Sequence, residues 1–222
     1  MPELIINGPA GRIEARYHHE SKNDSPAALI LHPHPQFGGT MNNQIVYHLY
    51  YTFTERGFSV LRFNFRGVGR SQGYFDNGPG ELADAASALD WLQMHNPDAR
   101  SCWIAGVSFG TWIAMQLLMR RPEIDGFICI APPANLYDYS FLAPCPSSGL
   151  LVSGEKDRVV PTQSVAELAA KTKAQRGIKL DHTIIPTANH FFEGKHDELK
   201  RVVGDYVDKR MVEIEAARKE SE

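Results

Sequence analysis

The chain has 222 residues, of which 43% are hydrophobic and 22% charged, and its formal net charge is −3. This composition excludes an intrinsically disordered or fibrous protein, and the slight excess of acid provides no basic surface for nucleic acid. The length suits one domain, so we expect residues 1–222 to fold as a single unit whose tail, about 216–222, is frayed.

Cysteine content and the first residues both bear on the compartment. Cys102, Cys129 and Cys145 cannot all pair within one chain, and the N-terminal sequence lacks the basic start and apolar stretch of a signal peptide. Together these features predict a cytoplasmic protein. The uncharged run at 101–119 approaches the length of a membrane span, but small and polar residues interrupt it. We interpret it as a buried strand followed by a buried helix, and we expect no association with a membrane.

The predicted elements begin with an antiparallel hairpin, because residues 4–7 and 12–20 flank the turn residues Gly8-Pro9-Ala10-Gly11. Runs of β-forming apolar residues and segments of helical spacing then alternate. In chain order they predict a strand at 27–32, a helix at 42–56, a strand at 58–64, a helix at 79–95, a strand at 102–107, a helix at 109–120, strands at 126–131 and 148–153, a helix at 162–176 ending at Gly177, a strand at 180–185 and a helix at 195–218. This alternation is typical of an α/β protein with a mostly parallel central sheet and helices on both faces.

A sequence typical of a nucleophilic serine lies where the strand at 102–107 meets the helix at 109–120. Gly106-Val107-Ser108-Phe109-Gly110 matches G-x-S-x-G, the nucleophile elbow, in which serine occupies a strained turn with positive φ. Glycines are needed on either side because longer side chains would collide with the turn. We therefore predict that Ser108 is the nucleophile.

Such a serine needs an imidazole to take its proton and a carboxylate to orient that imidazole. In this architecture the partners follow later strands in the order Ser, Asp, His. Asp157 follows the strand at 148–153 and His190 follows the strand at 180–185, which predicts that both meet Ser108 at the carboxyl edge of the sheet. Glu155 is the alternative acid, and Asp157 would then only cap the turn before the next helix.

Backbone donors must also stabilise the oxyanion of the tetrahedral intermediate. One is expected from the N–H of Phe109, the residue after the serine. The other is expected from the loop that follows the strand at 27–32, His32-Pro33-His34-Pro35-Gln36-Phe37-Gly38-Gly39-Thr40. Because proline has no N–H, the second donor is His34 or Gln36, and we favour His34.

The remaining polar motifs have structural interpretations. His182 lies within a predicted strand and His196 at a helix start, so both are expected to be structural or solvated. His32 and His34 are spaced to bind a metal, but no third ligand follows at useful spacing, so we expect no metal or cofactor and predict that His32 shapes its loop. The glycines around Arg66 indicate a tight turn in preference to a phosphate cradle.

The motifs resemble those of the α/β-hydrolases, and in particular the small, cap-free members related to dienelactone hydrolase. The resemblance covers almost the whole chain, from the His-Pro-His-Pro loop through Phe63-Asn64-Phe65-Arg66-Gly67-Val68-Gly69-Arg70-Ser71 and the elbow to His190. It implies an α/β-hydrolase fold and cofactor-free hydrolysis of esters, thioesters, lactones or amides. This chain departs from the family at two positions: dienelactone hydrolases have cysteine in place of Ser108, and many members have Asp in place of Asn64, so Asn64 is given no catalytic role.

We therefore expect a serine hydrolase that cleaves a carboxylic ester-type bond of a small-molecule acyl substrate. Only about 17 residues, 131–147, separate the strand at 126–131 from the strand at 148–153, which leaves little room for a folded lid and predicts an open site. The candidate walls of that site are Tyr137, Tyr139, Phe141 and Phe192. A thioesterase or acyltransferase, or a binding protein that has lost the reaction, are the alternatives, and assembly into a homo-oligomer is left open.

Overall fold

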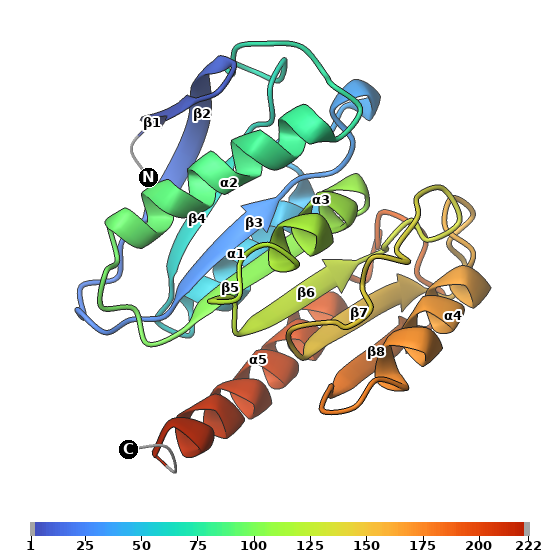
Figure 1. Ribbon diagram of the computed structural model, residues 1–222. Coiled ribbons are helices and arrows are strands. Elements are labelled where there is room, and N and C mark those ends of the chain that lie inside the picture. The colour runs from blue at the N-terminus through green and yellow to red at the C-terminus, as the bar shows by residue number, and fades with distance from the viewer. Residues whose placement is uncertain (1–2, 220–222) are drawn as a thin grey trace.

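The structure, a computed structural model, describes residues 3–219 and contains a central sheet whose strands lie in the order β1-β2-β4-β3-β5-β6-β7-β8 (Figure 1). The strands are β1 (Glu3–Gly8), β2 (Gly11–His18), β3 (Ala27–Leu31), β4 (Ser59–Phe63), β5 (Cys102–Val107), β6 (Gly126–Ile130), β7 (Gly149–Gly154) and β8 (Leu180–Ile185). β1 pairs with β2 and β2 with β4 in antiparallel fashion, and the other pairs are parallel. The predicted hairpin and mostly parallel sheet are therefore confirmed.

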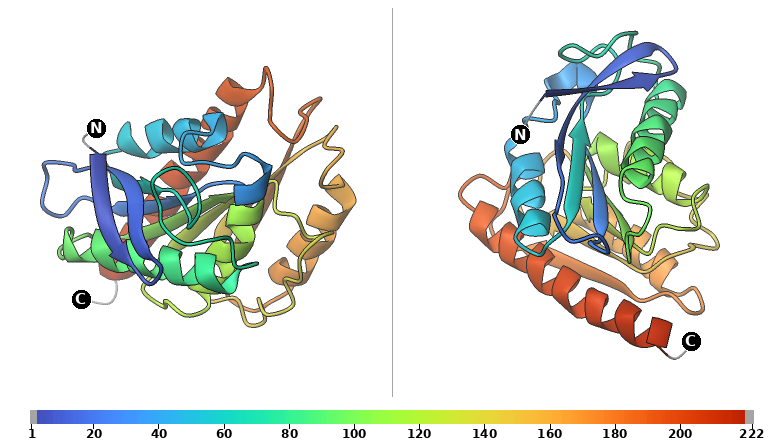
Figure 2. Two further views of the ribbon diagram at one scale, coloured as in Figure 1. Left: turned by 90° about the horizontal axis from the view of Figure 1, so that it is seen from above. Right: turned by 90° about the vertical axis from the view of Figure 1, so that its left-hand side faces the viewer.

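Helices cover both faces of this sheet (Figure 2). They are α1 (Gln44–Thr54), α2 (Pro79–Met94), α3 (Phe109–Leu118), α4 (Thr162–Lys173) and α5 (His196–Lys219). The apolar side chains of α1 and α5 pack into one core cluster, and those of α2, α3 and α4 pack into the other. Each helix falls within one or two residues of its predicted bounds except at the end of α4.

The prediction that the fourth helix reaches residue 176 and is capped by Gly177 is wrong. The helix ends at Lys173 with Ala174 as its C-cap, and Gly177 has a φ of 82° in the turn that follows. The physical reason is Gln175, whose side-chain amide donates to the carbonyl of Leu142 and accepts from the N–H of Cys145. These two bonds hold Gln175 against the segment between β6 and β7, away from a helical path.

The uncharged run at 101–119 forms β5 and α3, as predicted. All six residues of β5 are buried between the two core clusters, and eight of the ten residues of α3 are buried. Within residues 3–219, no helix has both the length and the apolar character that crossing a membrane requires.

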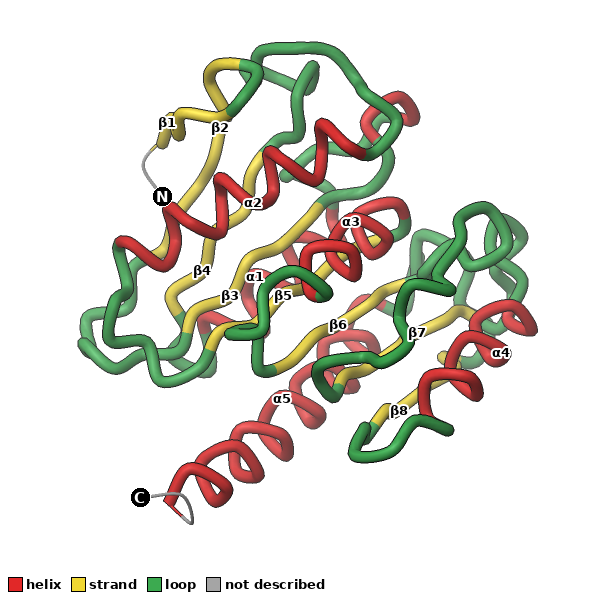
Figure 3. The backbone as a smooth tube through the Cα atoms, viewed as in Figure 1, coloured by secondary structure: helices red, strands yellow, loops and turns green. Residues whose placement is uncertain are grey.

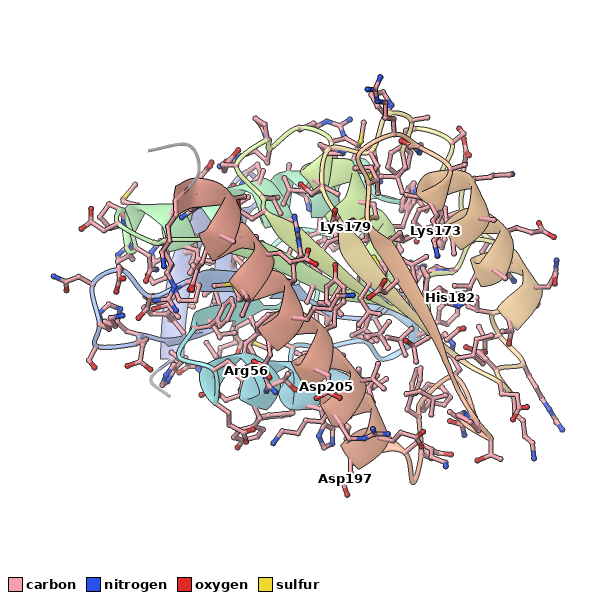
Figure 4. All side chains as sticks on the ribbon, turned by 90° about the horizontal axis from the view of Figure 1, so that it is seen from below. Arg56, Lys173, Lys179, His182, Asp197 and Asp205 are labelled. Carbon is pink, nitrogen blue, oxygen red and sulfur yellow. The ribbon has the colours of Figure 1, made fainter. Side chains whose placement is uncertain are left out.

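The long helix α5 closes the fold by crossing the face of the sheet that α1 also covers (Figure 4). Arg56, two residues after the end of α1, forms a bidentate ion pair with Asp208 of α5, with N–O distances of 2.8 and 2.9 Å. Lys200 of α5 pairs with Glu55. Residues 216–219 of the predicted frayed tail belong to α5, and 220–222 lie outside the described residues.

Loops at the carboxyl edge of the sheet carry the predicted catalytic side chains. The helices run along the faces of the sheet, and the loops gather at its ends (Figure 3). Because β5, β7 and β8 are parallel, Ser108, Asp157 and His190 all follow strands that end at the same edge.

Candidate active site

Ser108 occupies a sharp turn between β5 and α3. Its φ of 50° and ψ of −121° lie in a region that residues with a side chain rarely adopt. A Cβ at Gly106 would lie 2.6 Å from the carbonyl oxygen of Gly110, and a Cβ at Gly110 would lie 2.6 Å from that of Leu31. Both contacts are too close for any other residue. The two glycines therefore let α3 begin directly against β3 and β5, which presents the serine at the carboxyl edge.

A buried hydrogen-bond chain stabilises this strained turn. The carbonyl of Ser108 accepts from the backbone N–H of Thr111 at 2.8 Å and from its hydroxyl at 2.6 Å. Since that hydroxyl proton is used, the Tyr139 hydroxyl must donate to Thr111 Oγ1, 2.7 Å away. Burial raises the pKa of Tyr139 well above its ordinary value, so the phenol keeps the proton that it donates. Neither Thr111 nor this function of Tyr139 was predicted.

Asp157 and His190 form a hydrogen-bonded pair. Asp157 Oδ2 lies 2.8 Å from His190 Nδ1, and Asp157 Oδ1 accepts from the N–H groups of Val159 and Val160, each at 2.8 Å. The side chain of Asp157 is fully buried, while that of His190 is 11% exposed. An acid held at one oxygen by two backbone donors presents the other in a fixed direction, so it orients the imidazole with Nε2 free to accept a proton.

Glu155, the alternative acid, has a different partner. Its Oε2 accepts from the N–H of Thr187 at 2.8 Å, and Thr187 has a φ of 61°. The backbone N–H of Lys156 donates to the carbonyl of Ala188 in the same loop. Glu155 thus holds the loop that carries His190 and does not contact the imidazole, which favours Asp157 as the acid.

The bond between the serine and the imidazole is not formed in this state. Ser108 Oγ makes no hydrogen bond within the part of the chain that the structure describes. Catalytic hydrogen bonds are often long in a free enzyme and tighten only around a substrate.

His34 and Gln36 are the two predicted sources of the second oxyanion donor, and one hydrogen bond distinguishes between them. The N–H of Gln36 donates to His34 Nδ1 at 3.2 Å and is therefore occupied. The N–H groups of His34 and Phe109 make no hydrogen bond within residues 3–219. The rings of these two residues pack with centroids 4.8 Å apart. The geometry favours His34 and Phe109 as the donor pair.

His32 joins the ends of β3 and β4. Its Nε2 accepts from the N–H of Phe65 at 3.0 Å, and its Nδ1 lies 2.6 Å from the carbonyl of Pro33, so Nδ1 carries the proton and donates. Burial lowers the pKa of His32 to about 3, which keeps the ring neutral. With both nitrogens engaged, His32 shapes the loop at 32–40, the candidate oxyanion loop, as predicted. No group of three or more His, Cys, Asp or Glu side chains in the described chain is arranged to hold a metal ion.

The glycine-rich turn after β4 is held by acids in place of a bound phosphate. Asp84, on α2, accepts from the backbone N–H of Arg66 and from two nitrogens of its guanidinium. Glu14 accepts from Asn64 Nδ2 and from the N–H of Arg70. The donors of this turn are therefore bonded to carboxylates of the protein itself, which agrees with the prediction of a tight turn in preference to a phosphate cradle.

Two of the other histidines also have structural partners. His182 Nε2 lies 2.9 Å from Ser153 Oγ, and burial lowers its pKa. His196 Nε2 lies 3.0 Å from the carbonyl of Phe191, beside His190, and its ring stacks on that of His48. Both histidines therefore pack and bond within the fold, as predicted.

The four predicted walls of the site have different environments. Tyr137 and Tyr139 line a pocket of about 470 Å³ between the 134–143 segment and α4, which no predicted catalytic residue lines. Tyr139 is only 6% exposed and supports the elbow, and Phe141 stacks on it. Phe192 is fully buried in the core against α5, so its prediction as a wall is wrong. The backbone of Phe192 has a φ of 52°.

Two aromatic side chains that were not predicted flank the site instead. Phe37 is 85% exposed and packs on the ring of His34, with centroids 4.6 Å apart. Phe191 is 57% exposed and lies edge-on to the ring of His190. One exposed aromatic ring thus adjoins His34, and another adjoins His190.

The fold and the edge of the sheet on which these side chains gather define an α/β-hydrolase without a lid. The chain belongs to the X-Pro dipeptidyl-peptidase (S15) family, whose sequence model matches residues 10–209. These similarities make the protein a hydrolase, and therefore an enzyme.

Two solved structures show the similarity in three dimensions. A protein of unknown function from Agrobacterium tumefaciens is 63% identical, with a TM-score of 0.92 over 95% of this chain and 96% of that chain. A Xanthomonas campestris protein described as an α/β serine hydrolase without lid is 29% identical, with a TM-score of 0.85 over 94% of each chain.

Two relatives show it in sequence. An uncharacterized protein from Rickettsia prowazekii is 51% identical over 211 residues, which span 93% of this chain and 89% of that protein. The lysophosphatidylserine lipase ABHD12 of Bos taurus is 26% identical over 94% of this chain, which spans 62% of the length of that lipase.

Proposed function

We propose that the protein is a serine hydrolase that cleaves carboxylic esters through an acyl-enzyme intermediate. Ser108 attacks the acyl carbonyl, and His190 Nε2 takes the hydroxyl proton while Asp157 holds the imidazole in the required tautomer. The oxyanion lies between the N–H groups of Phe109 and His34. His190 then returns the proton to the leaving alcohol, and water attacks the acyl group to release a carboxylic acid and restore Ser108.

The observation that supports this proposal most strongly is the fixed Asp157–His190 pair at the same sheet edge as a strained serine. The 2.8 Å bond, with the acid fully buried, is the arrangement that a general base needs and that a structural histidine does not. Backbone strain at Ser108 is the second support, because strain of this kind persists at functional positions. A binding protein that had lost the reaction would not need both.

An ester with an apolar acyl group suits the surroundings of the serine. Exposed Phe37 and Phe191 flank the oxyanion loop and the base, and Leu136 and Val159 are exposed on the loops that follow β6 and β7. Such side chains form a surface for an apolar group at an open site. The similarity to a lipase supports the same choice of bond.

The family description favours a second candidate, cleavage of an amide bond after proline at the same serine. Paired substrates distinguish the two: p-nitrophenyl butyrate releases p-nitrophenol from an ester, and Ala-Pro-p-nitroanilide releases p-nitroaniline from an amide. We expect turnover of the ester and little of the anilide. Turnover of the anilide alone would reject the ester proposal. Comparing the p-nitrophenyl and thiophenyl esters of one acid tests for thioesterase activity. Repeating the ester assay with an added alcohol tests for acyltransferase activity.

The role of the serine is tested by Ser108→Ala on the same ester. We expect turnover to fall by several orders of magnitude, because removing the nucleophile of a triad leaves only the oxyanion hole and substrate binding. Thermal unfolding should stay close to that of the unmodified protein, since Ser108 Oγ makes no hydrogen bond within residues 3–219. Unchanged turnover in a folded variant would refute the assignment.

A further inference from the structure

A second pocket lies away from the catalytic residues, where α1 faces β2 and β4. Its volume is about 310 Å³. Five side chains line it: Arg16, Tyr47, Tyr50, Tyr51 and Arg62. Neither arginine has a predicted role, and the proposed reaction uses none of these residues.

The two arginines of this pocket face each other across the sheet. Arg16 of β2 and Arg62 of β4 are direct partners in the antiparallel register, so their side chains project from the same face. Like charges at directly opposed positions destabilise a sheet. Their pairing therefore calls for negative charge nearby.

Arg62 is a buried cation whose partners are neutral. It is 3% exposed, and its NH1 donates to the carbonyl of Met41 at 2.7 Å and to Asn42 Oδ1 at 2.9 Å. The guanidinium carbon lies 4.3 Å from the centre of the Tyr47 ring. Its Nε is buried without a hydrogen-bond partner, and no carboxylate of the described chain comes within 4.0 Å of it. A buried charge left in this way is costly unless something pairs with it.

Glu3 forms only a long ion pair with Arg16, because it pairs more closely with another arginine. Glu3 Oε1 lies 3.8 Å from Arg16 NH1, beyond hydrogen-bonding distance, but only 2.7 Å from Arg70 NH1. Glu14 Oε2 accepts from Asn64 Nδ2 and from the N–H of Arg70. Because Glu3 is shared between two arginines and Arg62 has no ion-pair partner within the described chain, positive charge is in excess at this pocket.

We propose that this pocket binds the phosphate group of a small organic phosphate. A phosphate monoester carries about −1.5 to −2 charges at neutral pH, which matches two facing guanidinium groups better than a carboxylate does. Two guanidinium forks and the tyrosine hydroxyls supply the donors. The volume exceeds that of a phosphate ion, and the half-exposed ring of Tyr51 provides a surface for the organic part.

Binding is tested by calorimetric titration of the whole protein with phenyl phosphate and with inorganic phosphate, with potassium chloride at equal ionic strength as the blank. We expect saturable binding of phenyl phosphate, with inorganic phosphate binding more weakly at the same site. Equal affinity for the two ions would overturn the choice of an organic phosphate and assign the pocket to free phosphate. Heat no greater than that of the chloride blank would overturn the proposal as a whole.

Three substitutions locate the site. Arg16→Gln, at a side chain only 26% exposed, should weaken binding of phenyl phosphate about tenfold or more, and Arg62→Gln should do the same if it folds. Arg176→Gln, at an exposed position outside the pocket, makes the same change in net charge and should leave binding unchanged. If Arg16→Gln and Arg176→Gln bind phenyl phosphate equally well, the pocket is not the site and the proposal fails.

Discussion

Replacing Asp157 with asparagine distinguishes the proposed catalytic role of this carboxylate from its structural role in the loop after β7. The introduced side chain keeps an oxygen that accepts from the N–H groups of Val159 and Val160, so the loop after β7 retains both bonds. The other position becomes an amide, which donates where the carboxylate accepted from His190 Nδ1. The imidazole must then place its proton on Nε2, and it no longer takes the proton of the serine hydroxyl.

The expected loss follows from that change of tautomer. In a triad of this type the substitution lowers kcat by about 10⁴-fold, or about 5.5 kcal/mol of transition-state stabilisation. Only one charge-assisted hydrogen bond is lost from the folded state, so the free energy of unfolding should fall by about 1–3 kcal/mol. Ester hydrolysis and urea unfolding measure the two effects.

Glu155→Gln is the matched control for Asp157→Asn. Glutamine keeps an oxygen that accepts from the N–H of Thr187, and the residue is exposed, so turnover should change less than about tenfold. The reasoning is refuted if Glu155→Gln abolishes hydrolysis while Asp157→Asn preserves it, because the acid would then be Glu155.

Two further predictions concern the groups that hold the site in place. Because burial lowers the pKa of His32 from 6.5 to about 3, the unfolded chain binds a proton that the folded one does not, and stability should fall by about 2 kcal/mol between pH 6.5 and pH 5. Urea unfolding at both pH values checks this, and a His32→Gln variant with an equally steep fall would contradict it. Thr111→Val leaves the buried hydroxyl of Tyr139 unpaired and should cost about 1–3 kcal/mol, part of which Tyr139→Phe should restore in the double variant. If the stability losses of the two single variants simply add in the double variant, as measured by thermal unfolding, the hydrogen bond between Thr111 and Tyr139 is not supported.

The sequence predicts the fold well because hydrophobic spacing and turn residues agree over most of its length. The near-continuous apolar strands β3 to β7 are buried on both faces of the sheet, which is the pattern that distinguishes a parallel sheet. The order Ser108, Asp157, His190 is likewise predictable, because each residue follows the end of a parallel strand and such ends share one edge.

Side-chain direction in loops is less predictable. Phe191 and Phe192 are adjacent and chemically identical, yet one is exposed beside His190 and the other is fully buried. Phe192 also has a positive φ, which the sequence does not indicate because the residue is not glycine. The sequence likewise does not reveal that Tyr139 supports the elbow, because its hydroxyl partner, Thr111, lies far away along the chain.

Contacts that depend on strand register are also hidden in the sequence. Arg16 and Arg62 lie far apart in the sequence, and only the antiparallel register of β2 and β4 makes them direct neighbours. A shift of one residue would place them on opposite faces of the sheet, because side chains alternate along a strand. The pocket at α1 could therefore be recognised only from the structure.

Labelling with a fluorophosphonate tests most directly whether His190, oriented by Asp157, activates Ser108. The reagent bonds covalently to an activated serine hydroxyl and displaces fluoride, and peptide mass spectrometry identifies the residue that carries the phosphonate. The account predicts rapid modification at Ser108 that is strongly slowed in His190→Ala and Asp157→Asn. Modification at another serine, or labelling of Ser108 that proceeds at the same rate without the imidazole, would contradict it.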